Sequence, residues 1–410
     1  MLWQPSLPDE YIRATPDQLA GRIAARRKQL GSDLVILAHH YQTDEIIRHA
    51  DFTGDSLKLS QLAADQVAKQ KAKYVVFCGV HFMAETADML TPESTAVILP
   101  DLSAGCSMAD MADYDDTVVA WKNLHESLHK QGWAGRIIPV TYINSTAAIK
   151  AFVGEHGGTV CTSSNAQAVL EWALAGGTIP KAADEDIKIL FLPDQHLGRN
   201  TASKLGFDAK REMALYDPRL TARGEPLGGS SAQQVLNAKA ILWAGHCSVH
   251  KLFRPEHVEA IRAADATLPP SERTRVLVHP ECVKEVVDVS DENGSTEYII
   301  RAIRGAATGS RWAVGTEFHL VSRLAAEAAQ RGVAVRILSD CQCLCTTMYR
   351  IDQPHLCWVL DHLAKGKVIN QVQVTPQARE LALKALDRML TLSALQTRSP
   401  RNEAAVATID

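Results

Sequence analysis

The chain has 410 residues, and 43 basic against 47 acidic side chains leave a formal net charge of −4 and a pI near 6.4. This balance argues against a broad nucleic-acid-binding surface, which needs clustered positive charge. With 46% apolar and 22% charged residues, the composition is that of a globular protein too long for a single core.

Targeting signals are not evident in the sequence. The first sixteen residues lack a positively charged region followed by an apolar stretch, and no run reaches the roughly 18 apolar residues that a membrane span needs. We therefore expect no secretion signal, no membrane contact and a reducing, cytoplasmic location. There, the nine cysteines indicate metal ligands, catalytic groups or core residues rather than disulfides.

Short runs rich in Val, Ile and Leu recur along the chain and predict strands. They lie at 34–38, 74–78, 96–100, 137–142, 159–162, 187–192, 240–244, 275–280, 311–316 and 335–340. Continuous apolar runs are typical of parallel strands covered by helices on both faces, and helical patterns such as 56–70 and 166–175 supply the crossovers. We predict an α/β protein whose chemistry lies at the carboxyl ends of its strands, with poorly ordered residues at 1–12 and 396–410.

Three cysteines follow the third, seventh and tenth predicted strands in short polar motifs: Cys106 in GCSMAD, Cys247 in GHCSVH and Cys345 in CTTMYRID. Their spacings become similar if a polar segment of roughly 30 residues, near 204–234, is an insertion between strands. The spacing suggests three similar α/β units around a centre, each contributing one cysteine. The predicted domains, in chain order, are 18–130, 131–238 (with the insertion), 239–345, and C-terminal helices at 346–395 that pack back on the first unit.

Three thiolates on a four-iron cluster would leave one iron without a protein ligand, and such an iron can act as a Lewis acid. Cys345 is favoured over Cys341 and Cys343, because it opens a helical pattern whose positive end would stabilise a thiolate. The alternative is a local zinc site in the C-x-C-x-C run, with His355 or Cys357 as fourth ligand. Core packing is the expected role of the other cysteines: Cys78, Cys161, Cys282 and Cys357.

Two motifs at strand ends pair groups suited to acid–base chemistry. His39 and Tyr41 in AHHYQ are two residues apart and can point the same way, and His279 and Glu281 in VHPEC repeat the spacing. Such pairs at strand ends suit general acid–base catalysis. The alternative for either motif is a hydrogen-bonded structural pair.

Hydroxyl groups cluster where predicted strands lead into helices, at 54–60, 161–166, 293–296 and 314–320. Each alone is weak evidence, because Ser and Thr cap many helices. Together they suggest a substrate with phosphate or carboxylate groups, for which Tyr142 and Asn144 offer neutral donors. A Walker loop and a GxGxxG fingerprint are both missing, so a nucleotide is not expected.

The ordered set AHHYQ, GDSL, FMAETA, GCSMAD, TYINSTAAIKA, CTSSNA, PDQHLGRN, GHCSVH, HPE, GST and CTTM, from about Leu34 to Met348, resembles the quinolinate synthase family of bacteria and archaea. The resemblance implies three similar three-layer αβα units with parallel sheets, in a pseudo-threefold triangular arrangement around a central 4Fe–4S cluster. It also implies condensation of iminoaspartate with dihydroxyacetone phosphate to quinolinate, phosphate and water, in NAD biosynthesis. The segment near 204–234 is extra relative to shorter members, and CQCLCTTM replaces a run like C-P-x-M, whose spacing favours Cys345.

The site residues that the resemblance implies fall into groups. The cluster ligands are Cys106, Cys247 and Cys345. The residues expected to line the cavity are His39, Tyr41, Tyr142, Asn144, His250, His279 and Glu281, of which Tyr41, Tyr142, His250, His279 and Glu281 are the catalytic candidates. The phosphate- or carboxylate-binding residues are Ser56, Ser163, Ser164, Ser295 and Thr296. Glu281 is the leading candidate for moving protons between carbon and oxygen, with Tyr41 as the complementary donor.

Because the imine substrate is unstable, functional coupling to an aspartate-oxidising enzyme is also expected. Two other hypotheses stay open on the residues alone. One is a zinc-dependent lyase or aldolase acting on a phosphorylated ketose. The other is a non-catalytic iron–sulfur sensor, in which replacement of Glu281 or Tyr41 would have no consequence.

Overall fold

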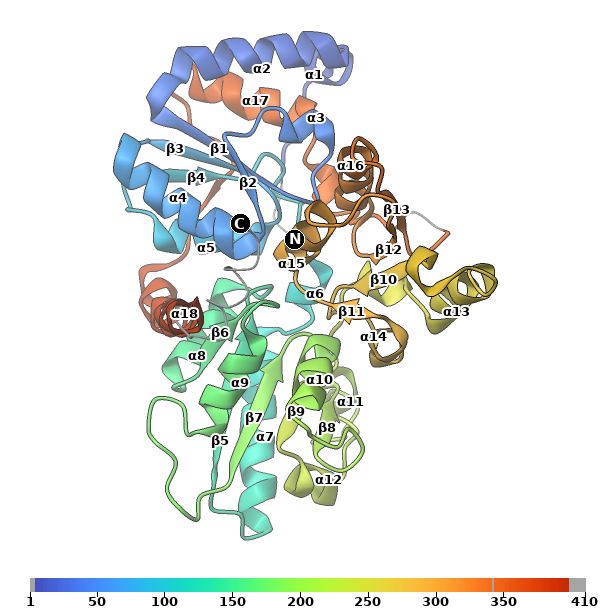
Figure 1. Ribbon diagram of the computed structural model, residues 1–410. Helices are drawn as coiled ribbons and strands as arrows, with labels where there is room; N and C mark the ends of the chain where they lie inside the picture. Colours follow the sequence, from blue (N-terminus) through green and yellow to red (C-terminus); the bar gives the residue numbers. More distant parts are fainter. Residues whose placement is uncertain (1–3, 341–342, 398–410) are drawn as a thin grey trace. The chain divides into compact units, whose positions relative to one another are not determined.

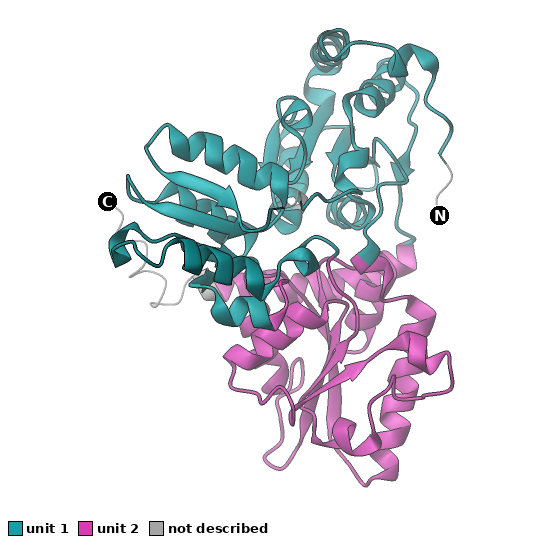
Figure 2. Ribbon diagram, turned by 90° about the vertical axis from the view of Figure 1, so that its right-hand side faces the viewer, with its two compact units in different colours: residues 1–107, 248–279, 285–375 teal, residues 108–247, 280–284, 376–410 magenta. Residues whose placement is uncertain are grey.

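The computed structural model describes residues 4–340 and 343–397, which contain three β-sheets flanked by helices (Figure 1). The chain divides into two compact units (Figure 2). Unit 1 comprises 1–107, 248–279 and 285–375, and unit 2 comprises 108–247, 280–284 and 376–410. The predicted α/β class is confirmed, whereas the triangular arrangement of three units stays a prediction. Among the described residues, no helix is both long and apolar enough to cross a bilayer.

The first sheet of unit 1 has the strand order β14-β4-β3-β1-β2. Its strands are β1 (Leu34–His39), β2 (Phe52–Gly54), β3 (Tyr74–Cys78), β4 (Ala96–Ile98) and β14 (Gln371–Val372). All pairings are parallel except that of β14 with β4. Every residue of β1 is buried, which explains its continuous apolar run. Helices of this part are α2 (Pro16–Leu30), α3 (Asp44–Ile47), α4 (Ser56–Gln70), α5 (His81–Leu90) and α17 (Gln353–Leu363), with η1 at Gly31–Asp33.

The second sheet of unit 1 is fully parallel, with the order β11-β10-β12-β13. Its strands are β10 (Arg275–Val278), β11 (Glu292–Asn293), β12 (Arg311–Gly315) and β13 (Ala334–Ile337). Its helices are α13 (Pro255–Ala264), α14 (Lys284–Val289), α15 (Thr296–Arg304) and α16 (Phe318–Ala329), with η2 (His250–Leu252), η3 (Pro270–Glu272) and η4 (Met348–Arg350). Ile299 and Ile303 of α15 and Leu320 and Leu324 of α16 are buried in one core with Val314 of β12. Because the two residues named in each helix are four positions apart, they lie on the same face of that helix.

The sheet of unit 2 has the order β6-β5-β7-β9-β8, all parallel. Its strands are β5 (Arg136–Tyr142), β6 (Thr159–Cys161), β7 (Ile187–Leu192), β8 (Met213–Tyr216) and β9 (Ala240–Trp243). Its helices are α7 (Tyr114–Lys130), α8 (Ala147–Glu155), α9 (Ala166–Leu174), α10 (Gln195–Lys204), α11 (Pro218–Thr221), α12 (Ala232–Asn237) and α18 (Pro376–Thr397), and α6 spans Ser107–Asp110. Helix α18 packs so closely on α8 that a Cβ on Gly154 would lie 1.9 Å from the Leu381 carbonyl oxygen.

The segment near 204–234 differs from the predicted surface insertion, because it contains β8, the edge strand of the unit 2 sheet. The predicted boundary at 238/239 falls before β9, although β9 pairs with β7 and β8. Of the C-terminal helices, α17 contacts α2 of the first sheet, whereas α18 contacts α8 and β6 in unit 2. The apolar runs predicted the strands, but they did not show which strands share a sheet.

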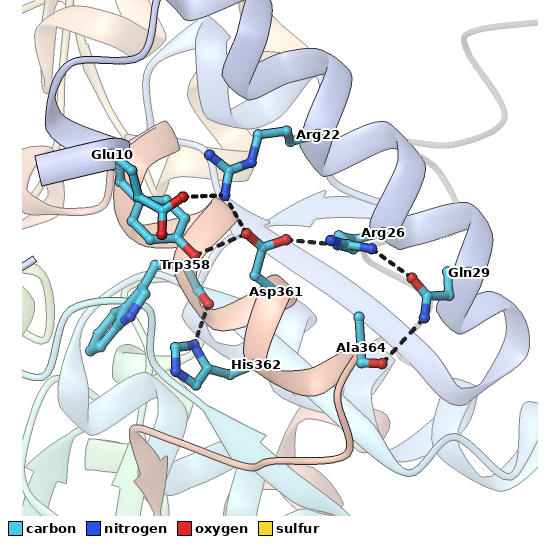
Figure 3. A network of polar contacts seen from close by, with 9 residues as sticks. Glu10, Arg22, Arg26, Gln29, Trp358, Asp361, His362 and Ala364 are labelled. Carbon is cyan, nitrogen blue, oxygen red and sulfur yellow. Dashed lines mark hydrogen bonds and ion pairs between the residues drawn. The ribbon is translucent and has the colours of Figure 1, made fainter. Parts of the chain in front are cut away.

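The expected disorder of the first dozen residues is wrong for 9–12, which form α1 (Asp9–Ile12). A carboxylate on α17 holds this segment in place (Figure 3). Asp361, 3% exposed, accepts hydrogen bonds from Tyr11 Oη at 2.9 Å, Arg22 Nη2 at 2.5 Å and Arg26 Nε at 2.7 Å. Glu10 forms a second ion pair with Arg22, at 3.4 Å. Burial of Tyr11 and ion pairing therefore anchor a segment that carries no apolar pattern of its own.

Candidate functional site

The motif AHHYQ places a histidine and a tyrosine side by side at the end of β1. The rings of His39 and Tyr41 lie 4.6 Å apart in an edge-on arrangement, and the backbone N–H of Tyr41 donates to His39 Nδ1 at 3.1 Å. His39 is 4% exposed. The two side chains thus lie on the same side of the chain, as their spacing predicted.

The Tyr41 hydroxyl is the centre of a polar network in unit 1. It lies 3.2 Å from Thr296 Oγ1, at the start of α15, and 3.1 Å from Thr316 Oγ1, just after β12. Thr316 Oγ1 also lies 3.1 Å from His250 Nε2, and the His250 ring stacks on His279 at 4.5 Å. Thr316, which the sequence reasoning did not select, therefore connects Tyr41 and its neighbour Thr296 to the stacked pair His250 and His279.

The four hydroxyl-rich motifs do mark strand-to-helix junctions, as predicted. They connect β2 to α4, β6 to α9, β11 to α15 and β12 to α16. Ser56 is the first residue of α4 and Ser295 caps α15, its Oγ accepting from the Tyr298 N–H at 3.3 Å. Ser163 is partly exposed and Ser164 is exposed, in the turn before α9.

Unit 2 holds a second part of the predicted set, centred on a buried carboxylate. Tyr142, at the end of β5, donates its hydroxyl to Glu281 Oε1 at 2.7 Å, and both side chains are almost fully buried. The backbone around Glu281 is fixed by Asn200 of α10, whose Nδ2 donates to the carbonyls of Pro280 at 2.9 Å and Cys282 at 2.8 Å. The unit boundary falls between His279 and Pro280, so Glu281 belongs to unit 2.

A further carboxyl group that the sequence reasoning missed, Asp194, lies in the PDQHLGRN motif. It is fully buried and caps α10, accepting from the N–H groups of His196 at 2.7 Å and Leu197 at 2.8 Å. Burial, followed by the negative charge of Glu281, raises the pKa of Asp194 well above its usual value. Two buried carboxyls that repel each other favour a state with one proton between them. Asn144, near Tyr142, has a buried Oδ1 that accepts no hydrogen bond from the described residues.

Exposure separates the described cysteines into two groups. Cys106, Cys247 and Cys345 are partly exposed, whereas the buried cysteines are Cys78, Cys161, Cys282, Cys343 and Cys357. Burial raises the pKa of Cys78 to about 12 and that of Cys357 to about 11, as expected for thiols that pack in a core. The three cysteines selected by spacing and motif are thus the described cysteines that are not fully buried. Cys106 and Cys345 belong to unit 1 and Cys247 to unit 2.

The region around Cys345 departs from one prediction. Instead of opening an α-helix, Cys345 precedes the short 3₁₀ turn η4, and burial raises the pKa of its thiol. A helix dipole therefore does not account for thiolate formation there. Cys343 is fully buried with its Sγ 3.1 Å from Ser339 Oγ, and Cys341 lies outside the described residues. His355, the fourth ligand of the alternative zinc site, instead lies 2.7 Å from Asp352 through its Nδ1.

Buried carboxyl, imidazole or hydroxyl groups at the carboxyl ends of parallel strands, found in each unit, are typical of an α/β enzyme. The family model described as "Quinolinate synthetase A protein" matches residues 21–391. The quinolinate synthase of Acidobacterium capsulatum is 50% identical over 384 residues, which cover 94% of this chain and 95% of the relative. That of Bacillus subtilis is 48% identical over 387 residues, covering 94% and 96%. The chain belongs to the quinolinate synthase family, whose reaction serves NAD biosynthesis.

Proposed function

We propose that this chain condenses iminoaspartate with dihydroxyacetone phosphate, using a 4Fe–4S cluster held by Cys106, Cys247 and Cys345. The observation that carries the proposal is the agreement between motif and exposure, since these three are the partly exposed thiols among the described cysteines. A cluster ligand near a substrate has to be reachable, and these three residues keep partial exposure while the other described cysteines are buried. When bound, the cluster supplies a Lewis acid through the iron that no cysteine holds.

In unit 2, Glu281 is proposed to take and return protons as the carbon skeleton is rearranged. The hydrogen bond from Tyr142 at 2.7 Å orients its carboxylate, and Asn200 fixes the backbone on either side. Burial and the charge of Glu281 raise the pKa of Asp194, so Asp194 holds a proton more readily than an exposed carboxyl does. A base held in this way loses little orientation entropy during the reaction.

In unit 1, Tyr41 is proposed to act as the complementary proton donor. Its hydroxyl lies 3.1 Å from Thr316 Oγ1, and that oxygen lies 3.1 Å from His250 Nε2. A proton given up by Tyr41 can be replaced along these two hydrogen bonds, because a threonine hydroxyl both donates and accepts. His250, stacked on His279, would be the source of that proton.

The helix starts are proposed to hold the anionic groups of the substrates. Hydroxyl groups beside unpaired backbone N–H groups suit phosphate and carboxylate oxygens. The candidates, each at or next to the first residue of a helix or in the turn before it, are Ser56, Ser163, Ser164, Ser295 and Thr296. Fixing the carboxylates and the phosphate would make ring closure a matter of orientation.

The proposal includes a reducing, cytoplasmic location, since the eight described cysteines are all free thiols. It also includes functional coupling to an aspartate-oxidising enzyme. An imine hydrolyses readily in water, so a source close to the site would limit its loss.

Anaerobic purification followed by iron, sulfide and zinc analysis tests the proposal. We expect a brown protein with about four irons and four sulfides per chain, which forms quinolinate from the two substrates. A colourless protein with one zinc per chain would instead support a zinc-dependent lyase. Quinolinate formation by protein stripped of iron would contradict the role given to the three cysteines.

A further inference from the structure

The loop after β1, residues 40–44, carries Tyr41 and makes three contacts with one guanidinium group. Arg323 of α16 donates from Nη1 to the Gln42 carbonyl at 2.8 Å and pairs with Asp44 Oδ1 at 3.0 Å. Its Nη2 donates to the His40 carbonyl. The acceptors thus include the carbonyls on both sides of Tyr41, and all these residues belong to unit 1.

The side chains of the same loop are tied to α15. His40 Nε2 lies 3.2 Å from Glu297 Oε1, and the Tyr41 hydroxyl lies 3.2 Å from Thr296 Oγ1. Two neighbouring loop residues therefore contact two neighbouring helix residues. Arg323 binds the backbone of the loop, and the loop side chains of His40 and Tyr41 contact α15. A shift of the loop would therefore move the Tyr41 hydroxyl away from Thr296 and Thr316.

We propose that Arg323 is a positioning residue that holds the 40–44 loop so that the Tyr41 hydroxyl keeps its place in the reaction. A guanidinium group suits this task, since its five donors sit in a rigid planar fork that fixes the directions of its acceptors, whereas an ammonium group is a compact charge on a flexible stem. Its side chain is 23% exposed and its bonds to the His40 and Gln42 carbonyls are part-buried, whereas Asp44, 76% exposed, is open to water. The proposal rests on the role of Tyr41 given under Proposed function.

Arg331 offers a matched control within the same unit. It also donates to backbone carbonyls, those of Arg304 at 2.8 Å, Ala306 at 3.4 Å and Ile303 at 2.9 Å. These acceptors lie at the end of α15 and beyond it, at the opposite end of that helix from Thr296. Loss of either arginine removes hydrogen bonds to backbone carbonyls. Of the two, only Arg323 contacts the 40–44 loop.

The test compares steady-state quinolinate formation by anaerobic wild-type enzyme and by the Arg323→Ala, Arg323→Lys and Arg331→Ala variants, with iron content measured for each. We expect Arg323→Ala to lower kcat by about 10- to 100-fold, the size typical of a small misplacement of a reacting group. The KM for dihydroxyacetone phosphate should change less than about threefold. Arg323→Lys should fall between, added guanidinium should partly restore Arg323→Ala, and Arg331→Ala should keep the wild-type kcat.

Each contrary outcome is decisive. Equal losses of kcat in Arg323→Ala and Arg331→Ala would show a general effect on stability and overturn the proposal. An unchanged kcat, a change confined to KM, or a loss of iron in Arg323→Ala would overturn it as well. If Arg323→Ala does not fold, Arg323→Lys decides, and wild-type kcat in that variant contradicts the proposal. Failure of the proposed function is distinct, because the wild-type enzyme itself would then form no quinolinate.

Discussion

Replacement of Asp361 by alanine should destabilise unit 1 strongly, although Asp361 lies outside the residues assigned to catalysis. The carboxylate is 3% exposed and accepts from Tyr11, Arg22 and Arg26 at 2.5–2.9 Å. Tyr11 is 4% exposed, so its hydroxyl would lose its buried acceptor, at a cost of about 1–3 kcal/mol. The two arginine side chains are 34% and 36% exposed, so water replaces part of each ion pair and roughly 1 kcal/mol is lost for each. The expected total is about 4 kcal/mol.

Urea unfolding under anaerobic conditions, followed by circular dichroism, measures this loss. The matched control is Asp9→Ala, because Asp9 pairs with Arg13 at 2.5 Å but their side chains are 73% and 80% exposed. Removal of that pair should cost less than about 0.5 kcal/mol. The rate of quinolinate formation per folded molecule should be unchanged in both variants. A loss below about 1 kcal/mol for Asp361→Ala would refute the reasoning that burial, rather than ion-pair geometry, sets the cost.

The remaining predictions concern the site and the response to pH. Cys345→Ala should abolish both iron binding and activity, whereas Cys343→Ala should keep both; iron analysis showing the reverse would exchange the two assignments. Glu281→Gln should keep the iron content and lower kcat by at least about 100-fold, and a near-normal rate would remove Glu281 from the mechanism. Thr316→Val should lower kcat roughly tenfold and leave the KM values unchanged, with wild-type kcat as the contrary result. Burial lowers the pKa of His49 from 6.5 to about 4, so between these values the unfolded chain binds a proton that the folded chain does not. The free energy of unfolding should therefore fall by up to about 3 kcal/mol as pH drops from 6.5 to 4, and His49→Gln should flatten this slope in urea titrations.

The strands that the sequence predicted differ from those it did not predict in length and in their position in the sheet. All ten continuous apolar runs correspond to strands, from β1 to β13. The four strands without a prediction, β2, β8, β11 and β14, have two to four residues each and all lie at sheet edges. Their residues, such as the exposed Gln371 of β14, do not form a continuous apolar run. Edge strands pair on one side only, so their sequences carry less of the pattern.

The site residues divide in a similar way. Tyr41, Glu281 and the three cysteines stand in dense polar motifs after apolar runs. Such motifs can be recognised from the sequence alone. Thr316 lies in the 314–320 motif without being distinguished there, and Arg323 stands alone in its segment. Their contacts with the loop after β1 span 275 positions for Tyr41–Thr316 and 281 for Gln42–Arg323. Single hydroxyl and guanidinium groups with distant partners leave no periodic signal. Asp194 was visible in its motif, but only burial next to Glu281 revealed its raised pKa.

The order of residues by itself determined the α/β class, the principal strands and the motifs that carry the chemistry, because buried strands and polar strand ends are local patterns. Only the tertiary structure decided which strands share a sheet, which cysteines are fully buried and which groups hold Tyr41 and Glu281 in place. These are matters of contact between distant segments, and contact depends on how the chain packs rather than on any one stretch of it.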